Sequence, residues 1–185
     1  MNDELLIEPV DCTRSSIIKV IGVGGGGGNA VANMYCEGLH DVRFLVCNTD
    51  RKALESSAVP DRLQLGPGLG AGGDPETGRA LAEGDLEAID DIFDEDTKMV
   101  FITAGMGGGT GTGASPIIAR EAKSRGLLTV AIVTIPFLFE LQRQVDKALD
   151  GVERLAKEVD AILVINNERL REIYPALTVI KAFKR

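Results

Sequence analysis

The chain contains two separate runs of glycine, and each lies between a strand-like apolar segment and a helix-like one. The first run, residues 22–29 (GVGGGGGN), follows the apolar residues 17–23, and the second, residues 104–113 (AGMGGGTGTG), follows residues 99–103. Because glycine has no Cβ, such clusters indicate backbone that approaches another group closely. Backbone N–H groups at the start of a helix attract anions, so the two runs predict a pair of phosphate-binding loops.

Strand-like apolar segments alternate with helix-like segments along most of the chain. Strands are expected at residues 17–23, 42–47, 62–65, 99–103, 127–133 and 161–165. Nearly continuous apolar strands separated by helices are typical of a parallel sheet covered on both faces. We therefore predict an α/β, Rossmann-like fold with a mostly parallel sheet, in which ligands bind at the carboxyl ends of the strands.

Local signals predict where several helices begin and end. Helices are expected at residues 29–37, from Asp74-Pro75, from Ser115-Pro116 to Gly126, and over residues 140–159. Asp74-Pro75 and Ser115-Pro116 each place a capping side chain before a proline at the first helical position. In the last helix the residues expected to share one apolar stripe are Val145, Ala148, Leu149, Val152, Leu155, Ala156 and Val159.

Composition and charge exclude several classes of protein. The chain has 185 residues, 44% of them hydrophobic, which is enough for one domain with a sizeable core. A net charge of −8 makes it a poor nonspecific binder of nucleic acid or anionic lipid. Its three cysteines lack metal-type spacing and are typical of reduced thiols in the cytoplasm. We find no signal-peptide pattern and no apolar run of membrane-spanning length, so no direct membrane insertion is expected.

The first glycine run alone leaves two interpretations open. Its GxGxxG pattern, at Gly22, Gly24 and Gly27, is shared with dinucleotide-binding folds, in which Asp41 or Asp50 would be the acidic residue about 20 positions later. An NAD-dependent oxidoreductase is therefore the alternative. The second glycine run speaks against it, because a dinucleotide fold does not need a second phosphate cradle. The GxxxxGK[ST] motif of P-loop proteins does not occur in the sequence.

The second glycine run carries a specific resemblance. GGGTGTGA at residues 107–114 resembles the signature of the tubulin/FtsZ family of GTPases. Other segments are similar to this family and follow in its order: KVIGVGGGGGNAV at 19–31, CNTD at 47–50, GLGAGGDPETG at 68–78 and TIPFLFE at 134–140. The resemblance extends from about residue 17 to the last residue, and it implies a GTP-binding domain of the FtsZ type.

The resemblance also implies a role for each part of the site. The two glycine runs would hold the phosphates of GTP or GDP, with Mg²⁺ bound through those phosphates and no metal ligand set of the protein's own. The loop at residues 70–73 would sense the γ-phosphate and its Mg²⁺. Glu140 would grip the ribose or, alternatively, cap a helix. Asn167 would lie beside the base or, alternatively, be an exposed loop residue.

The implied nucleotide contacts form a definite set. They are Gly25, Gly26, Gly27, Gly28, Asn29, Thr49, Asp50, Gly72, Gly73, Gly108, Gly109, Thr110, Gly111, Thr112, Glu140, Gln144 and Asn167. Gln144 stands where the family usually has a basic residue, and Leu141 where it usually has glycine, so a charged contact is missing here. We expect Gly109→Val to abolish nucleotide binding while leaving the fold intact.

The resemblance further implies partners and location. Relatives form head-to-tail filaments of FtsZ subunits in the cytoplasm at the division site, and nucleic acid is not among the expected partners. We divide the chain into a leader (1–16), the GTP-binding domain (17–177) and the opening of a central helix (178–185).

The residues expected to act on the attacking water follow that helix in the family and serve the neighbouring subunit. We therefore expect no catalytic residue within these 185 residues, and binding of GTP without appreciable hydrolysis. The alternative is a non-catalytic fragment or paralogue that caps division filaments.

Overall fold

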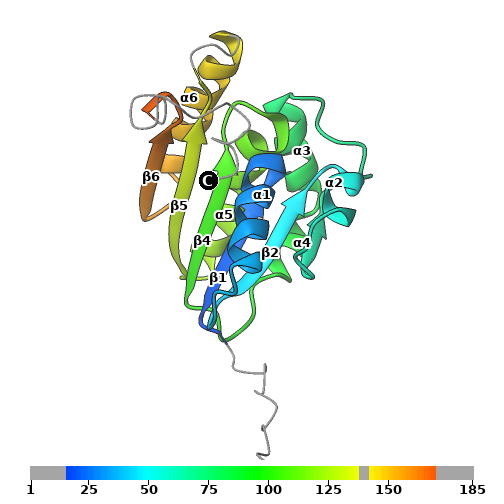
Figure 1. Cartoon of the computed structure of the whole chain (residues 1–185), viewed down its shortest axis with the longest axis vertical. Coiled ribbons are helices and arrows are strands. Elements are labelled where there is room, and N and C mark those ends of the chain that lie inside the picture. The colour runs from blue at the N-terminus through cyan, green and yellow to red at the C-terminus, as the bar shows by residue number, and fades with distance from the viewer. Residues whose placement is uncertain (1–15, 138–141, 170–185) are drawn as a thin grey trace, which may run out of the picture.

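The computed structural model describes residues 16–137 and 142–169. The predictions for residues 1–15, for Glu140 and Leu141, and for residues 178–185 lie outside them. The described chain forms one six-stranded sheet between two layers of helices (Figure 1). All five strand pairings are parallel. The predicted α/β fold with a parallel sheet is therefore confirmed.

The strands run in the order β3-β2-β1-β4-β5-β6 across the sheet. Their bounds are β1 (Ile18–Val23), β2 (Arg43–Asn48), β3 (Arg62–Gln64), β4 (Met99–Gly105), β5 (Leu128–Ile135) and β6 (Ala161–Asn166). Each lies where a strand was predicted, and its ends match the predicted ones to within two residues. The order places β1 and β4, the two strands that precede the glycine runs, side by side at the centre.

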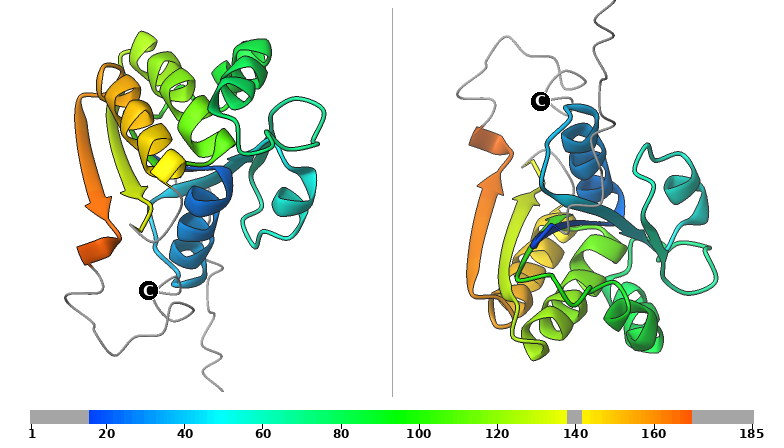
Figure 2. Two further views of the ribbon diagram at one scale, coloured as in Figure 1. Left: turned by 90° about the horizontal axis from the view of Figure 1, so that it is seen from above. Right: turned by 90° about the horizontal axis from the view of Figure 1, so that it is seen from below.

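Helices cover both faces of the sheet, as Figure 2 shows from its two ends. Helix α1 (Gly24–Cys36) lies on one face, where Val20, Phe44 and Val46 pack with Val31 of the helix. The other face carries the larger core and the helices α3 (Pro75–Gly84), α4 (Leu86–Asp90), α5 (Gly109–Ser124) and α6 (Gln142–Ala156). The short helices α2 (Arg51–Glu55) and α4 were not predicted.

Two helices begin earlier than predicted, inside the glycine runs. Helix α1 begins at Gly24 rather than at residue 29, and α5 begins at Gly109 rather than at Ser115-Pro116, so Pro116 lies inside the helix. Glycine and proline disfavour helix interiors, but close packing outweighs that preference here. A Cβ on Gly27, for example, would lie 2.1 Å from the carbonyl oxygen of Thr103. The glycine runs are thus mostly helix N-termini rather than loops.

Other boundary predictions hold. Asp74 caps α3, its carboxylate accepting from the backbone N–H of Thr77 at 3.1 Å, and Pro75 is the first helical residue. Gly126 follows the end of α5 with a φ of 73°, as expected for a glycine that stops a helix.

The predicted stripe on α6 is only partly correct. Ala148 and Leu155 are fully buried, but Leu149 is 53% exposed and Ala156 is also exposed. Gly151, which was not expected in the stripe, is buried against the side chain of Thr112. Strand β6 departs from the prediction of strands covered on both faces, because most of its residues are exposed. It is the last strand in the sheet order and pairs only with β5.

Charged residues join the amino end of the sheet to the loop before β4. The buried ammonium of Lys19 donates to the carbonyl oxygen of Ile92 and to the Asp94 carboxylate at 2.8 Å, and Arg43 contacts the same carboxylate at 2.7 Å. Ser16, which we assigned to the leader, is buried there, and its hydroxyl donates to the carbonyl oxygen of Asp41 at 2.5 Å. In the part of the chain that the structure describes, no helix has the length and apolar character to cross a membrane.

Candidate functional site

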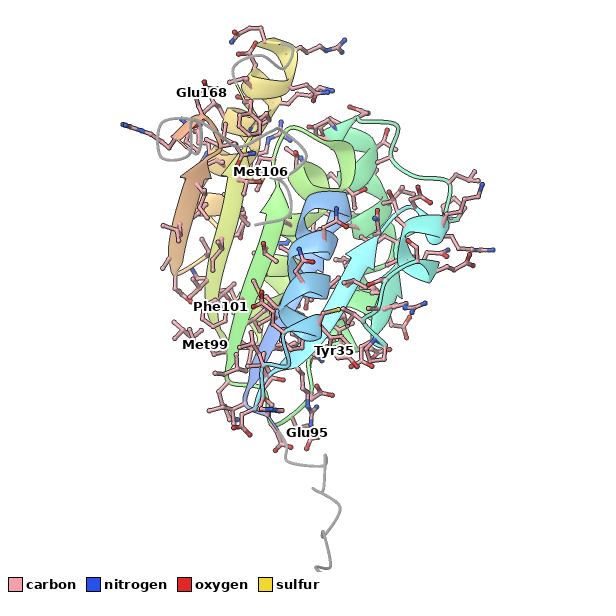
Figure 3. The ribbon with its side chains drawn as sticks, in the orientation of Figure 1. Tyr35, Glu95, Met99, Phe101, Met106 and Glu168 are labelled. Atoms are coloured by element: carbon pink, nitrogen blue, oxygen red, sulfur yellow. The ribbon has the colours of Figure 1, made fainter. Side chains whose placement is uncertain are left out.

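The N-termini of α1 and α5 meet at the carboxyl end of the central strands. Each helix starts within a few residues of its strand, and the two strands pair in register, with Val23 opposite Ala104. The helices then approach so closely that a Cβ on Gly24 would lie 2.8 Å from the backbone nitrogen of Gly111. Figure 3 shows Met106, just after β4, at the same end of the molecule as Glu168, just after β6. This end is where α/β proteins bind ligands.

These two helix N-termini carry no side-chain cap. Asp50 caps α2 and Asp74 caps α3, whereas Val23 and Gly108, the residues before α1 and α5, make no capping hydrogen bond. Neither first turn contains an acidic residue. The backbone N–H groups at both ends are therefore left for an external acceptor, and the aligned peptide dipoles favour an anion there.

Three predicted contacts at the starts of α1 and α5 are glycines with open space where a side chain would be. A Cβ built on Gly25, Gly28 or Gly108 would meet nothing within 4 Å. Gly25 is exposed in the first turn of α1, and Gly108 immediately precedes α5. Asn29, the next residue of α1, is exposed as well. These residues are accessible to a ligand lying across the two helix ends.

The other glycines that are predicted contacts in the two glycine runs are needed for packing, whereas Gly72 and Gly73 also have open space. A Cβ on Gly26 would lie 3.1 Å from the Cα of Gly105, and one on Gly111 would lie 2.6 Å from the carbonyl oxygen of that residue. A Cβ on Gly109 would lie 2.8 Å from the Cβ of Ala71 and 3.0 Å from the backbone of Asp74. Our expectation that Gly109→Val leaves the fold intact is therefore revised, because valine there would push α5 away from the loop before α3.

The threonine hydroxyls of the predicted site bond within the protein. Thr49 is fully buried, and its hydroxyl lies 2.7 Å from that of Thr110 in the first turn of α5. The hydroxyl of Thr112 accepts from the backbone N–H of Gly107 at 2.9 Å. Thr49 and Thr112 therefore position the backbone around the site. The sequence did not predict these hydrogen bonds, because the positions of the partner residues along the chain do not show that they are in contact.

A glycine-rich loop lies against the N-terminus of α5. Gly70 and Gly72 have positive φ values of 82° and 59°, and Gly73 has 72°. The N–H of Gly70 donates to the carbonyl oxygen of Thr49 at 2.9 Å. The side chain of Asp50 is engaged as the cap of α2, accepting from the N–H of Lys52 at 2.9 Å. This loop borders the helix ends on the side of β2 and β3.

The opposite side of the site is formed by the ends of β5 and β6 and the start of α6. Asn167 follows β6, and its N–H donates to the carbonyl oxygen of Ile135 at 3.3 Å. A Cβ on Gly107 would lie 2.9 Å from the carbonyl oxygen of Gln144, so the first turn of α6 touches the second glycine run. The side-chain oxygen of Gln144 is buried and has no hydrogen-bond partner among the described residues. Glu140 lies outside the described residues.

A cavity of about 230 Å³ opens beside the N-terminus of α1. It is bordered by Gly25, Gly28 and Asn29 on one side and by residues at the end of β2 and in and after α2 on the other. Ligand pockets for small molecules usually measure about 300–1,000 Å³, so this cavity is at most one part of a nucleotide site.

The described residues contain no group of three or more acidic, histidine or cysteine side chains placed to hold a metal ion. Cys47 is fully buried in β2, and burial, with a smaller contribution from Asp85, raises the pKa of its thiol far above the ordinary range. This cysteine is therefore a core residue and not a nucleophile.

Two uncapped helix ends at the carboxyl end of a parallel sheet are typical of α/β proteins that bind phosphate groups. Comparison with known proteins narrows this class. The family described as "Tubulin/FtsZ family, GTPase domain" matches residues 17–175. The chain belongs to the Tubulin/FtsZ family, and the resemblance inferred from its motifs is confirmed.

Among proteins of known name, the chain is closely similar to bacterial FtsZ. "Cell division protein FtsZ" of Porphyromonas gingivalis is 57% identical over 191 residues, covering 100% of this chain and 42% of that protein. The protein of the same name in Aquifex aeolicus is 50% identical over 172 residues, covering 90% of this chain and 47% of that protein. The chain thus spans about half the length of the relatives it matches.

Solved structures agree with the fold. An empty FtsZ dimer from M. jannaschii has a TM-score of 0.87 and 40% identity, covering 91% of this chain and 50% of that one. CetZ2 from Haloferax volcanii, described as a GTPgS-bound protofilament, has a TM-score of 0.79 and 26% identity, covering 90% of this chain and 53% of that one.

Proposed function

We propose that these residues form the guanine-nucleotide-binding part of an FtsZ-type division GTPase. The observation that carries the proposal is the pair of adjacent, uncapped helix N-termini whose accessible residues, Gly25 and Gly108, have no side chain in the way. Membership of the Tubulin/FtsZ family supplies the identity of the anion, a GTP or GDP phosphate chain.

The roles implied by the family resemblance, placed on the observed strand order, suggest how the nucleotide lies. The phosphates would sit over the ends of β1 and β4, where the two helices begin. Asn167, after β6, and Gln144, at the start of α6, lie on one side and would face the base and ribose, together with Glu140. The loop with Gly72 and Gly73 lies on the other side and would face the terminal phosphate.

Mg²⁺ would be held through the phosphates. The described residues provide no three-ligand acidic cluster, and the nearby Asp50 already caps a helix. Mg²⁺ commonly keeps several waters and binds phosphate oxygens in nucleotide sites, so a site without a protein cage fits it. The ion would neutralise charge on the phosphate chain and help to fix its terminal group.

Self-association is the second part of the proposal. Relatives are described as an FtsZ dimer and as a CetZ2 protofilament. We propose that the nucleotide face takes part in head-to-tail contacts with other subunits at the division site, in the cytoplasm. A polypeptide of these 185 residues alone would bind GTP and turn it over negligibly, since the carboxylates that act on water in the family come from outside this segment. Added to intact FtsZ, it would cap filament ends.

Nucleotide choice is the first test. Titration calorimetry with GTP, GDP, ADP and NAD should show that the two guanine nucleotides bind at least about tenfold more tightly than the other two. The reason is that protein groups which hydrogen-bond to guanine would be left unpaired by another base. Equal or tighter binding of NAD would favour the oxidoreductase alternative. Phosphate release that rises cooperatively with the concentration of the 185-residue polypeptide would contradict the absence of turnover.

A further inference from the structure

The glycine loop beside α5 is anchored unequally along its length. Its first residue, Gly70, is held by a backbone hydrogen bond to Thr49, and Asp74 N–H closes the turn onto the carbonyl oxygen of Ala71 at 3.0 Å. A Cβ on Gly72 or Gly73 would meet nothing within 4 Å, so no packing confines these two residues. Their positive φ values are readily accessible to glycine, so neither side-chain packing nor backbone strain explains this loop conformation.

A side chain from a distant helix holds the unconfined end of this loop. The ammonium of Lys147, on α6, donates to the carbonyl oxygen of Gly73 at 2.7 Å. Among the described residues, this is the one side-chain hydrogen bond to residues 70–73 for which the structure gives a distance. A charged donor makes it stronger than a neutral bond of the same length.

Helix α6 is brought close enough for this contact by a glycine. Lys147, Gly151 and Arg154 follow each other at helical spacing and share one face of α6. A Cβ on Gly151 would lie only 2.3 Å from the Cγ2 of Thr112, so the helix rests directly on the first turns of α5. One helical repeat further on, Arg154 pairs with Glu76 of α3 at 2.5 Å.

The two cationic contacts differ in what they hold. The side chains of Arg154 and Glu76 are 49% and 59% exposed, and ion pairs that open to water stabilise little. The hydrogen bond of Lys147 to Gly73 is also exposed, but the Lys147 side chain is partly buried and bonds to the backbone of the loop itself. Lys147 and Arg154 border the same cavity of about 190 Å³. Of the two, Lys147 is therefore the contact that bears directly on where the Gly73 carbonyl points.

We propose that Lys147 is a positioning residue that holds the Gly72–Gly73 backbone in place, and thereby makes the affinity for a nucleoside triphosphate higher than it would be with an untethered loop. The inference rests on the proposed function. In the orientation proposed above, this loop is reached by a third phosphate and not by the first two. A ligand that must also order the loop binds more weakly, so loss of the tether would weaken binding of GTP and spare that of GDP.

The test compares Lys147→Met with Lys157→Met in the 185-residue chain. Methionine keeps a long unbranched side chain but cannot donate, and Lys157 is a matched control on exposed turns of the same region, paired only with Glu153 at 3.2 Å. For Lys147→Met we expect about a threefold to tenfold loss of GTP affinity by calorimetry, as for one lost hydrogen bond from a charged donor, with GDP affinity changed less than about twofold. Lys157→Met should leave both affinities as they are, and Lys147→Arg should restore most of the GTP affinity.

The outcomes separate this inference from the function on which it rests. If the unaltered chain binds GTP and GDP but Lys147→Met leaves both affinities unchanged, or lowers both by the same factor, the positioning role is wrong while the nucleotide site stands. If the unaltered chain binds neither nucleotide, the proposed function is wrong and the inference fails with it. A melting temperature for Lys147→Met close to that of the unaltered chain would show that any loss of GTP affinity does not come from unfolding.

Discussion

Single residues of the glycine runs serve two different purposes. Gly27 and Gly111 are glycine because a neighbouring backbone occupies the space of a side chain. Gly25 and Gly108 have free space in that position, so the protein itself imposes no such requirement on them. Packing therefore does not explain glycine at these two positions, and they are where substitution can separate binding from folding.

Substitution of the open glycines should block the site without disturbing the fold. We expect Gly25→Val and Gly108→Val each to weaken GDP binding by tenfold or more, roughly the cost of losing one or two phosphate-to-amide hydrogen bonds of about 1.5–3 kcal/mol. Circular dichroism and the melting temperature should stay near those of the unaltered chain. Gly84→Val, at the open end of α3, is the matched control and should bind normally. Normal binding by both test variants would move the phosphate site elsewhere.

The motifs predicted which residues form the candidate site, but not which groups each side chain contacts. Thr49 and Thr112 were expected at the phosphates, and that stays a prediction; the structure adds that the hydroxyl of Thr49 bonds to that of Thr110 and that the hydroxyl of Thr112 accepts from the N–H of Gly107. Lys147 was not predicted at all, because only the fold brings it to Gly73. Which glycine faces solvent and which faces a carbonyl oxygen depends on how helices pack, and no local pattern contains that information.

Among the helices, α5 shows how tertiary packing overrides local preference. The sequence predicted its start at Ser115-Pro116, yet the helix begins at Gly109 and is buried for most of its length. Pro116 has no N–H, so the carbonyl oxygen of Thr112 lacks its usual helical donor, and the hydroxyl of Ser115 donates to the carbonyl oxygen of Gly111 at 2.5 Å. The close contact with α3 is what stabilises the early turns, because Gly113 faces the backbone of Pro75 and Arg79 directly.

The contact between α3 and α5 should be intolerant of a single methyl group. A Cβ on Gly113 would lie 2.1 Å from the carbonyl oxygen of Pro75 and 2.6 Å from the nitrogen of Arg79, so Gly113→Ala must separate the helices. We expect a loss of about 2–3 kcal/mol in the free energy of unfolding, measured with urea. Gly84→Ala, on α3 but with open space, should be neutral or slightly stabilising. A stable Gly113→Ala variant would mean that the helices can move apart at little cost.

At the scale of the whole molecule, the parallel sheet could be predicted from the sequence, but the exposure of its edge strand and the order of its strands could not. Apolar strands that alternate with helices have few alternatives to a parallel sheet, and all six strands were found near their predicted positions. The exposure of β6 was not predicted, because an apolar sequence such as AILVIN reads the same at the edge of a sheet as at its centre. The order of the strands also cannot be read from a pattern that is local in sequence.

The charged cluster at the amino end of the sheet should make stability depend on pH in the acid range. Burial acts to raise the pKa of Asp94, but the hydrogen bonds and charges of Lys19 and Arg43 outweigh it and hold the pKa below its ordinary value. A carboxylate with a lowered pKa stabilises the folded state above its unfolded-state pKa of about 4, and this contribution is lost as the pH falls further.

Asp94→Asn tests this dependence. At neutral pH we expect a loss of about 1–2 kcal/mol in the free energy of unfolding, because Lys19 is buried while Asp94 is partly exposed. The difference from the unaltered chain should shrink below about pH 4, where the carboxylate of the unaltered chain also becomes protonated. Asp96→Asn, at an exposed position nearby, is the control. A difference that stays constant between pH 7 and pH 3 would show that the ion pairs contribute nothing.

The central pairing of β1 with β4 has a consequence for the order of events during folding. Ile18 pairs with Met99, so the chain must close a long loop before these strands meet, and such non-local pairings form slowly. The N-termini of α1 and α5 come together only through that pairing. A phosphate ligand therefore has nothing to bind until the centre of the sheet is complete. Such a ligand would slow unfolding and would not speed folding. It would therefore extend the lifetime of the folded protein while leaving the folding rate unchanged.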